Sequence, residues 1–249
     1  MSATVFEKHL KAASDMGLVR DGEARLLYDI ACELPQGAVA VEIGSWMGKS
    51  ATAIALGLRT VKGRLHTIDD HRGVAGATDL PTGDKAREIF YKNLESAGVR
   101  ELIEHHSLSS DDLAPSWDKL IDFLFIDGNH EYKAARRDIF NYAPFVKPGG
   151  WIAFHDVGMK DDVFRAIEEW IDDRNIQISS MRFNNLIMAI RMPLKGEKTF
   201  GQIRMKLLRF GVPNSCKGIP AKSKPLQKFT AKLRQSVARR VVKAVGTKG

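Results

Sequence analysis

The 249-residue chain is 44% hydrophobic and 27% charged, which is the composition of a folded protein with one sizeable core. Its net charge is +8, it has two widely separated cysteines, and no run of about 18 apolar residues occurs. These features exclude a disulfide framework, a cysteine zinc site and a membrane-spanning helix. The first residues lack the pattern of a secretory signal, so we expect a cytoplasmic protein.

Short apolar runs that stop at a glycine or an acid alternate with amphipathic stretches along the chain. The runs predict strands at 38–44, 63–70, 101–107, 121–128 and 148–156. The stretches predict helices at 22–34, 49–61, 84–98, 131–146 and 161–173. Two last apolar segments, 177–183 and 185–192, are expected to pair as a hairpin. This order predicts an α/β, Rossmann-like, doubly wound and mostly parallel sheet with a terminal antiparallel hairpin, over residues 1–194.

Residues 71–84 form a Gly- and Pro-rich loop that follows the second expected strand. Such a loop lies at the ligand-binding edge of a doubly wound sheet. Two interpretations remain open, a lid or substrate loop and a solvated connector.

The segment "GSWMGKS", residues 44–50, nearly spells a triphosphate-binding loop. That loop needs four residues between its glycines, so that successive N–H groups encircle a phosphate. Gly44 and Gly48 enclose only three residues, and the dinucleotide fingerprint Gly-x-Gly-x-x-Gly is also absent. Neither nucleotide motif fits.

A ligand with both an amino-acid end and a ribose fits better, and S-adenosylmethionine is such a ligand. Glu42 ends the first strand and supplies negative charge for an ammonium, while Ser50 in the first helical turn can hydrogen-bond a carboxylate. Asp69 and Asp70 end the second strand, where a carboxylate suits two ribose hydroxyls. We favour Asp69 because it comes directly after the apolar run; a helix cap or a loop charge is the alternative.

Three segments in order, "VEIGSWMGKSA", "IDGNHEY" and "PGGWIAFHDV", resemble class I S-adenosylmethionine-dependent methyltransferases. The resemblance covers roughly residues 25–192 and is to the macrocin and mycinamicin sugar O-methyltransferases, and more distantly to catechol O-methyltransferase. It implies methylation of a sugar or glycan hydroxyl. The cofactor contacts that we expect are Glu42, Gly44, Ser45, Gly48, Ser50, Asp69 and Ser107.

Two further strands end in candidate metal ligands, Asp127 on one and His155 with Asp156 on its neighbour. The resemblance implies a divalent metal at these three positions, typically magnesium, which prefers oxygen ligands. Those relatives place oxygens at the last two positions, whereas His155 brings a nitrogen. Imidazole suits manganese, iron or zinc better than magnesium, which leaves the identity and the presence of the metal open.

His130 follows Asp127 by three residues, and the resemblance implies that it is the general base. A neutral imidazole can accept the proton of a sugar hydroxyl, and a coordinated cation lowers the pKa of that hydroxyl. The alternative is that His130 is simply a polar side chain on the surface of a loop. Among the other histidines, His71 is a weaker candidate for the substrate side, and His66 is expected to pack within its strand.

The C-terminal extension, residues 195–249, has 15 Lys and Arg against the single acid Glu197, so the preceding body carries a net charge of −6. Apolar residues recur there every three or four positions, which predicts a basic amphipathic helix. It suits an anionic membrane surface, docking onto the acidic body or a second subunit, or nucleic acid, of which the last is least expected. A small-molecule or glycan acceptor is the expected partner. The membrane interpretation would place the protein at the inner membrane surface; that interpretation, docking and a homo-oligomer all stay open.

The sequence thus predicts an S-adenosylmethionine-dependent O-methyltransferase that acts on a sugar hydroxyl with help from a divalent metal. A catechol-like phenol is the alternative acceptor. A nucleoside-triphosphate-binding protein and a non-catalytic adaptor with a basic tail are the alternatives of a different class.

Overall fold

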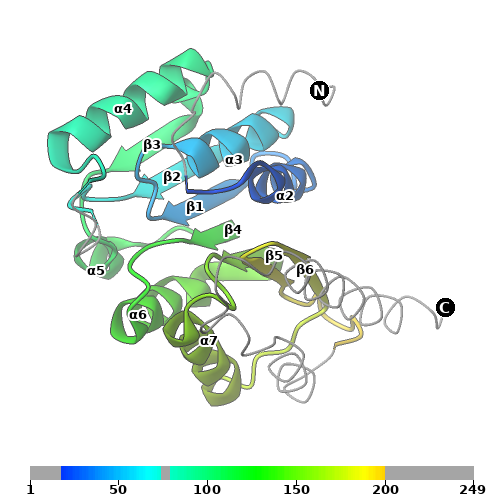
Figure 1. Cartoon of the computed structure of the whole chain (residues 1–249). Coiled ribbons are helices and arrows are strands. Elements are labelled where there is room, and N and C mark those ends of the chain that lie inside the picture. Colours follow the sequence, from blue (N-terminus) through cyan, green and yellow to red (C-terminus); the bar gives the residue numbers. More distant parts are fainter. Residues whose placement is uncertain (1–17, 74–78, 200–249) are drawn as a thin grey trace, which may run out of the picture.

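The computed structural model describes residues 18–73 and 79–199, which form one seven-stranded sheet with helices on both faces (Figure 1). The strands are β1 (Val39–Ile43), β2 (Arg64–Ile68), β3 (Ile103–His106), β4 (Ile121–Ile126), β5 (Val146–Phe154), β6 (Ser180–Asn184) and β7 (Ile187–Arg191). The helices are α2 (Asp21–Cys32), α3 (Lys49–Thr60), α4 (Gly83–Ser96), α5 (Ser110–Leu113), α6 (Tyr132–Tyr142) and α7 (Asp161–Asp173). Three short 3-10 helices are η1 (Arg100–Leu102), η2 (Ala114–Ser116) and η3 (Ala143–Phe145).

The strand order is β3-β2-β1-β4-β5-β7-β6, and β1 to β5 are parallel. The order reverses between β1 and β4, which places a crevice at the carboxyl ends of these strands. The hairpin of β6 and β7 is antiparallel, and its second strand inserts next to β5 while β6 forms the edge. The prediction of a mostly parallel, doubly wound sheet with a terminal antiparallel hairpin is confirmed.

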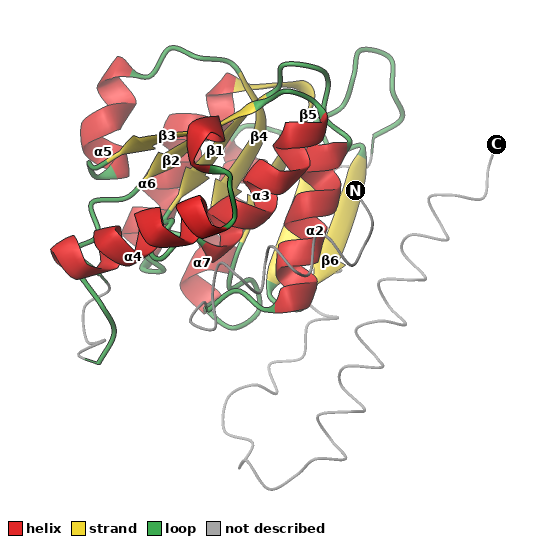
Figure 2. Cartoon of the chain, turned by 90° about the horizontal axis from the view of Figure 1, so that it is seen from above, coloured by secondary structure: helices red, strands yellow, loops and turns green. Residues whose placement is uncertain are grey.

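The helices divide between the two faces of the sheet: α2, α3 and α4 lie on one face, and α6 and α7 on the other (Figures 1 and 2). All six residues of β4 are buried, as the uninterrupted run "IDFLFI" requires of a strand covered on both sides. On the first face, Gly57 lets α3 approach α2, since a Cβ there would lie 2.6 Å from the backbone oxygen of Tyr28. The two faces hold separate apolar cores.

Both ends of the chain, residues 1–17 and 200–249, lie outside the described ranges. The predicted helix of the basic extension lies beyond residue 199, so its membrane, docking and nucleic-acid interpretations stay predictions. Within residues 18–73 and 79–199, no helix is both long and apolar enough to cross a membrane.

Candidate active site

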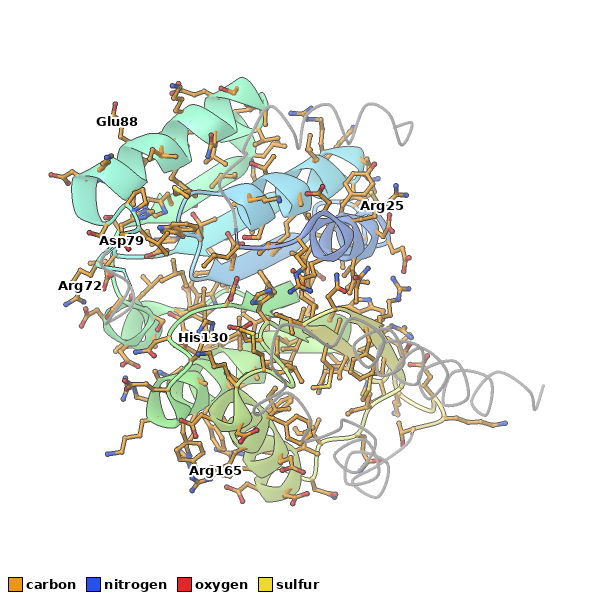
Figure 3. All side chains as sticks on the ribbon, in the orientation of Figure 1. Arg25, Arg72, Asp79, Glu88, His130 and Arg165 are labelled. Carbon is orange, nitrogen blue, oxygen red and sulfur yellow. The ribbon has the colours of Figure 1, made fainter. Side chains whose placement is uncertain are left out.

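A cavity of about 730 Å³ lies at the carboxyl ends of the parallel strands, where the order of the sheet reverses. The loops after β1, β2, β4 and β5 line it, together with the start of α3 and the segment before α5. Figure 3 shows His130, in the loop that enters α6, on the same side of the molecule as Arg72, in the loop that leaves β2. Most of the predicted site residues line this cavity: Gly44, Ser45, Gly48, Ser50, Asp69, Asp127, His130, His155 and Asp156.

The glycine loop joins β1 to α3 and packs directly against the end of β4. Gly44 has a φ of +85°, and a Cβ there would lie 2.2 Å from the carbonyl oxygen of Asp127. Gly48 has a φ of +86° and is the residue before α3, where its carbonyl accepts from Thr52 N at 2.9 Å. Both positions therefore need glycine, because left-handed backbone strains other residues and Gly44 has no room for a side chain.

Glu42 lies fully buried behind this loop and does not itself line the cavity. Neither of its carboxylate oxygens, nor the hydroxyl of Ser45, has a hydrogen-bond partner of good geometry among the described residues. Burial raises the pKa of Glu42 to about 8, against the opposing effect of the nearby Ser50 and Ser45 hydroxyls. A buried carboxylate without a partner is costly, and a cationic ligand at the loop would relieve that cost.

Asp69 ties the second strand to the glycine loop. Its carboxylate accepts from the backbone N–H of Trp46 at 2.6 Å and from that of His71 at 2.7 Å. The neighbouring Asp70 pairs instead with Arg72, whose Nε donates to it at 2.7 Å, and this pairing holds the pKa of Asp70 below its usual value despite partial burial. Asp69 and Asp70 both line the cavity. Two adjacent carboxylates, each with its own hydrogen-bond partners, are therefore available to a ribose.

Lys49 occupies the position of the phosphate-binding lysine in the near-match to a triphosphate loop. Its ammonium lies 3.0 Å from the carboxylate of Asp21 at the start of α2. The lysine is thus already paired with a neighbouring helix, in addition to the loop being one residue short. Both observations weigh against a triphosphate site.

Four titratable side chains meet at the ends of β4 and β5. His130 Nε2 lies 3.2 Å from Asp156 Oδ2 and 3.5 Å from Asp127 Oδ1, and His155 Nδ1 lies 3.1 Å from Asp127 Oδ1. Burial opposes ionisation of Asp127, yet hydrogen bonds from His130 and His155 outweigh it and keep its pKa below the usual value. Asp156 has a φ of +56°, a strained conformation that aims it at this cluster, and its Oδ1 is buried without a hydrogen-bond partner in the described ranges.

Glu23, in the first turn of α2, completes the cluster from behind, and the sequence interpretation missed it. It is fully buried, and its Oε2 accepts from Arg20 N at 2.7 Å and faces His155 Nε2 at 3.4 Å. Its Oε1 accepts from Leu186 N at 3.0 Å. Burial raises the pKa of Glu23, but these hydrogen bonds lower it further than burial raises it. A signal existed: Glu23 shares the apolar face of its helix with Leu27 and Ile30, at spacings of four and seven.

His155 therefore has a carboxylate at each ring nitrogen. Burial lowers its pKa, but the bonds to Asp127 and Glu23 dominate and raise it to about 10. The oxygen of Glu23 fixes the direction of the ring, which leaves Nδ1 facing the cavity beside Asp127. A histidine whose far nitrogen donates to a carboxylate is the usual arrangement of a metal ligand.

The metal-type donors fit a cation at this position. One ligand atom from each of Asp127, His130 and His155 lies within 4.8 Å of the others. The unpartnered oxygen of Asp156 adjoins them, 3.5 Å from His155 Nδ1. This mixed set of imidazole nitrogen and carboxylate oxygen suits manganese, iron or zinc more than magnesium.

Ser107, one of the predicted cofactor contacts, is not among the described residues that line the cavity. It is exposed, and its hydroxyl accepts from Arg87 of α4 at 3.3 Å. The four residues that follow it, 108–111, do line the cavity.

Comparison with known proteins agrees with this geometry. A family model described as "Methyltransferase domain" matches residues 41–157, which include the ends of β1, β2, β4 and β5. Residues 41–157 are thus similar to a methyltransferase domain, which supports the predicted enzyme class.

Several solved structures share the fold. The O-methyltransferase from Bacillus cereus in complex with SAH is 19% identical, with a TM-score of 0.56 over 77% of this chain and 92% of that one. The O-methyltransferase TomG from Streptomyces achromogenes, involved in tomaymycin synthesis and in complex with SAM, is 19% identical, with a TM-score of 0.57 over 78% and 92%. SAH-bound methyltransferase PaMTH1 from Podospora anserina is 14% identical, with a TM-score of 0.57 over 78% and 89%. At these identities the likeness establishes the Rossmann-like fold.

Proposed function

We propose that the protein is an S-adenosylmethionine-dependent O-methyltransferase that methylates a hydroxyl of a sugar or glycan with the help of a divalent metal. One observation carries the proposal: Asp69, Asp127 and Asp156, at the ends of three parallel strands, line one cavity together with His130, and Glu42, at the end of β1 between them, is buried behind the glycine loop of that cavity. The match to a methyltransferase domain and the SAM- or SAH-bound proteins of the same fold support it.

The residues around the glycine loop fit the cofactor. Glu42 and Ser45 offer buried oxygens that lack partners within the described residues, as an ammonium and a carboxylate require. Gly44, Gly48 and Ser50 would let the backbone of the loop and the first turn of α3 approach the amino-acid end, and Asp69, which lines the same cavity, would bind the ribose. When bound, the cofactor supplies an electrophilic methyl group to the cavity.

His130 has the position of the general base. It lines the cavity, and its Nε2 lies 3.5 Å from Asp127 Oδ1 and 3.2 Å from Asp156 Oδ2. The two carboxylates orient the imidazole and stabilise the positive charge that it gains when it takes the proton of the acceptor hydroxyl. His130 thus serves as the proton acceptor, while Asp127 and Asp156 hold it in place.

Asp127, His155 and Asp156 would hold the metal. Asp127 and His155 belong to one group of metal-type donors with His130, Asp156 Oδ1 lies 3.5 Å from His155 Nδ1, and Glu23 orients His155 from behind. A cation there would supply Lewis acidity, which lowers the pKa of a coordinated hydroxyl. Glu23 keeps the Nε2–H of His155 engaged, and Asp127 keeps an oxygen toward the cavity.

The lining of the cavity suits a polyhydroxylated acceptor on one side. Arg72, Asp111, Asn129 and Arg137 line it and can bind several hydroxyls. Four exposed apolar side chains also line it: Leu18, Leu80, Leu108 and Met159. This apolar rim favours a second candidate acceptor, a catechol-like phenol, or a sugar that carries an apolar group.

Titration calorimetry separates the cofactor classes. S-adenosylmethionine and SAH are expected to bind, and ATP is not; tight binding of ATP without binding of SAH would overturn the proposal. A Glu42→Ala variant should lose SAH binding, while Glu95→Ala, which alters an exposed carboxylate on α4, should keep it.

Methyl transfer to a panel of glycans and catechols, with and without EDTA, tests the acceptor and the metal. We expect transfer to a glycan, inhibition by EDTA, and recovery with manganese or zinc. Full activity in EDTA would remove the metal from the proposal, and activity on catechols alone would replace the glycan with a phenol.

A further inference from the structure

A second cluster of metal-type donors lies away from the active site, on β2 and the edge strand β3. It consists of His66, Glu104 and His106, none of which lines the cavity described above. His66 pairs with Glu104 in the register of the two strands, and His106 follows Glu104 by two residues. Because side chains alternate along a strand, all three project from the same face of the sheet.

The ligand atoms have the spacing of a tetrahedral metal site. His66 Nδ1 and His106 Nε2 lie 3.1 Å apart. Glu104 Oε2 lies 3.5 Å from His66 Nδ1, and Glu104 Oε1 lies 3.7 Å from His106 Nε2. A tetrahedral ion with bonds of about 2.0–2.1 Å holds its ligand atoms about 3.3–3.4 Å apart. The two nitrogens need to move apart by only a few tenths of an ångström to share one ion. Glu104 faces them with different oxygens, so its exposed carboxylate would turn to present one of them.

We propose that His66, Glu104 and His106 bind a zinc-type transition-metal ion that clamps the edge strand β3 to β2. Two imidazoles and one carboxylate are ligands that zinc prefers, with a water in the fourth position. The side chain of Glu104 is 61% exposed, which gives the ion a path from solvent, while that of His66 is 5% exposed and fixed.

The surroundings hold both rings in place. The rings of His66 and His106 stack with their centroids 5.4 Å apart and an interplanar angle of 20°. Trp117 packs edge-on against both, at centroid distances of 5.2 and 6.2 Å. His66 Nδ1 and His106 Nε2 are within hydrogen-bond distance of each other, so the proton between them would leave when a metal binds. Such preorganised rings lose little freedom when they bind a metal.

Lys119 opposes a cation at this site. Its ammonium lies 5.6 Å from the ring centroid of Trp117, near enough for its charge to lower the pKa of both histidines. The negative charge of Glu104 offsets that of Lys119. The proposal therefore predicts that Lys119→Ala binds zinc more tightly than the unaltered protein does.

The proposed zinc site is connected to the proposed cofactor site by a backbone hydrogen bond and not through the catalytic residues. The carbonyl oxygen of His106 accepts from Asp69 N at 3.1 Å. An ion that fixes His106 thus fixes the backbone that presents Asp69. The zinc site itself does not depend on the proposed function, since it is defined by its own three ligands.

Zinc titration of tag-free, full-length protein, first treated with a chelator, tests the clamp. Glu104→Ala should weaken one class of zinc sites at least tenfold, and His106→Ala should abolish it. The matched control Glu101→Ala, which removes an exposed carboxylate just before β3, should bind as the unaltered protein does. Asp127→Asn disrupts only the active-site cluster and should keep the clamp.

Two further readouts separate a clamp from a mere hydrogen-bond network. Cobalt in place of zinc should give the visible absorption of a tetrahedral ion, lost in His106→Ala and kept in Asp127→Asn. In an Asp127→Asn background, which removes the active-site cluster, zinc should raise the melting temperature of Glu101→Ala but not that of Glu104→Ala. Equal zinc binding by Glu104→Ala, His106→Ala and the unaltered protein would overturn the proposal, as would loss of all zinc binding in Asp127→Asn.

Discussion

Replacement of Glu42 by Gln is expected to stabilise the ligand-free protein while it weakens cofactor binding. The pKa of Glu42 is about 8 in the folded state, against an ordinary value of 4.5. Between these two pH values the folded protein holds a proton that the unfolded chain has released, so stability falls as the pH rises. Each pH unit costs about 1.4 kcal/mol, or roughly 3 kcal/mol from pH 4.5 to pH 7.

A glutamine cannot ionise and therefore avoids this loss. The advantage of the variant should be small at pH 5 and reach up to about 3 kcal/mol at pH 7, or roughly 6–12 °C in melting temperature for a domain of this size. Thermal unfolding of the ligand-free protein at pH 5, 7 and 8 measures it, with Glu95→Gln on the surface of α4 as the control. An unpaired amide would shift every curve equally, so only the pH dependence is diagnostic. A melting-temperature difference that is the same at all three pH values would refute the buried, protonated Glu42.

The ionisation of Glu42 also predicts how cofactor affinity depends on pH, because proton release and cofactor binding are linked. A cation near Glu42 favours its ionised form, so binding must release a proton below pH 8. The affinity of the unaltered protein for S-adenosylmethionine should therefore rise with pH, by up to about tenfold per unit between pH 6 and pH 8. Calorimetry in two buffers of different ionisation enthalpy measures the released proton, and the Gln variant should show none.

Three further predictions concern the base, the glycine loop and the cluster behind it. His130→Ala should lower kcat by about 10²- to 10⁴-fold with unchanged SAH affinity, and an unaltered pH–rate profile would remove it as the base. Gly44→Ala should lower the free energy of unfolding by at least about 2 kcal/mol in denaturant titrations, because the new Cβ meets the carbonyl of Asp127. The control is Gly37→Ala, at a residue with a φ of +73° and open space around it. It should lose only the cost of the left-handed conformation, about 1 kcal/mol. Glu23→Gln should weaken manganese or zinc binding at the active site by about 10- to 100-fold, and unchanged affinity would show that it does not orient a ligand.

Local patterns in the sequence predict the parts of the site that come from strand ends. The apolar runs that stop at Glu42, Asp69 and Asp127 mark buried parallel strands, and the parallel arrangement then brings the three acids to one edge. The helices followed from amphipathic spacing, and α7 matches its predicted range, 161–173. These inferences succeed because each uses information within a few neighbouring residues.

Contacts between distant segments were beyond such reasoning. Glu23 meets His155 from 132 positions away in the chain, and nothing near either residue states the pairing. The approach of His66 to His106 depends on the register of β2 and β3, which periodicity does not set. The insertion of β7 between β5 and β6 does have a local signal, since β7, IMAIR, is apolar and buried whereas β6, SMRFN, is largely polar and suits an edge.

The close packing of the glycine loop on the end of β4 has an evolutionary consequence. The backbones of two walls of the cavity are in close contact, at Gly44 and Asp127. A substitution that moves one of these walls therefore moves the other as well. Substitutions that change the acceptor should then occur mainly at the opening of the cavity. Leu80, Leu108 and Met159 line it, are exposed to solvent and make no such backbone contact. A descendant of this chain with a different acceptor should thus differ at its rim while its floor stays the same.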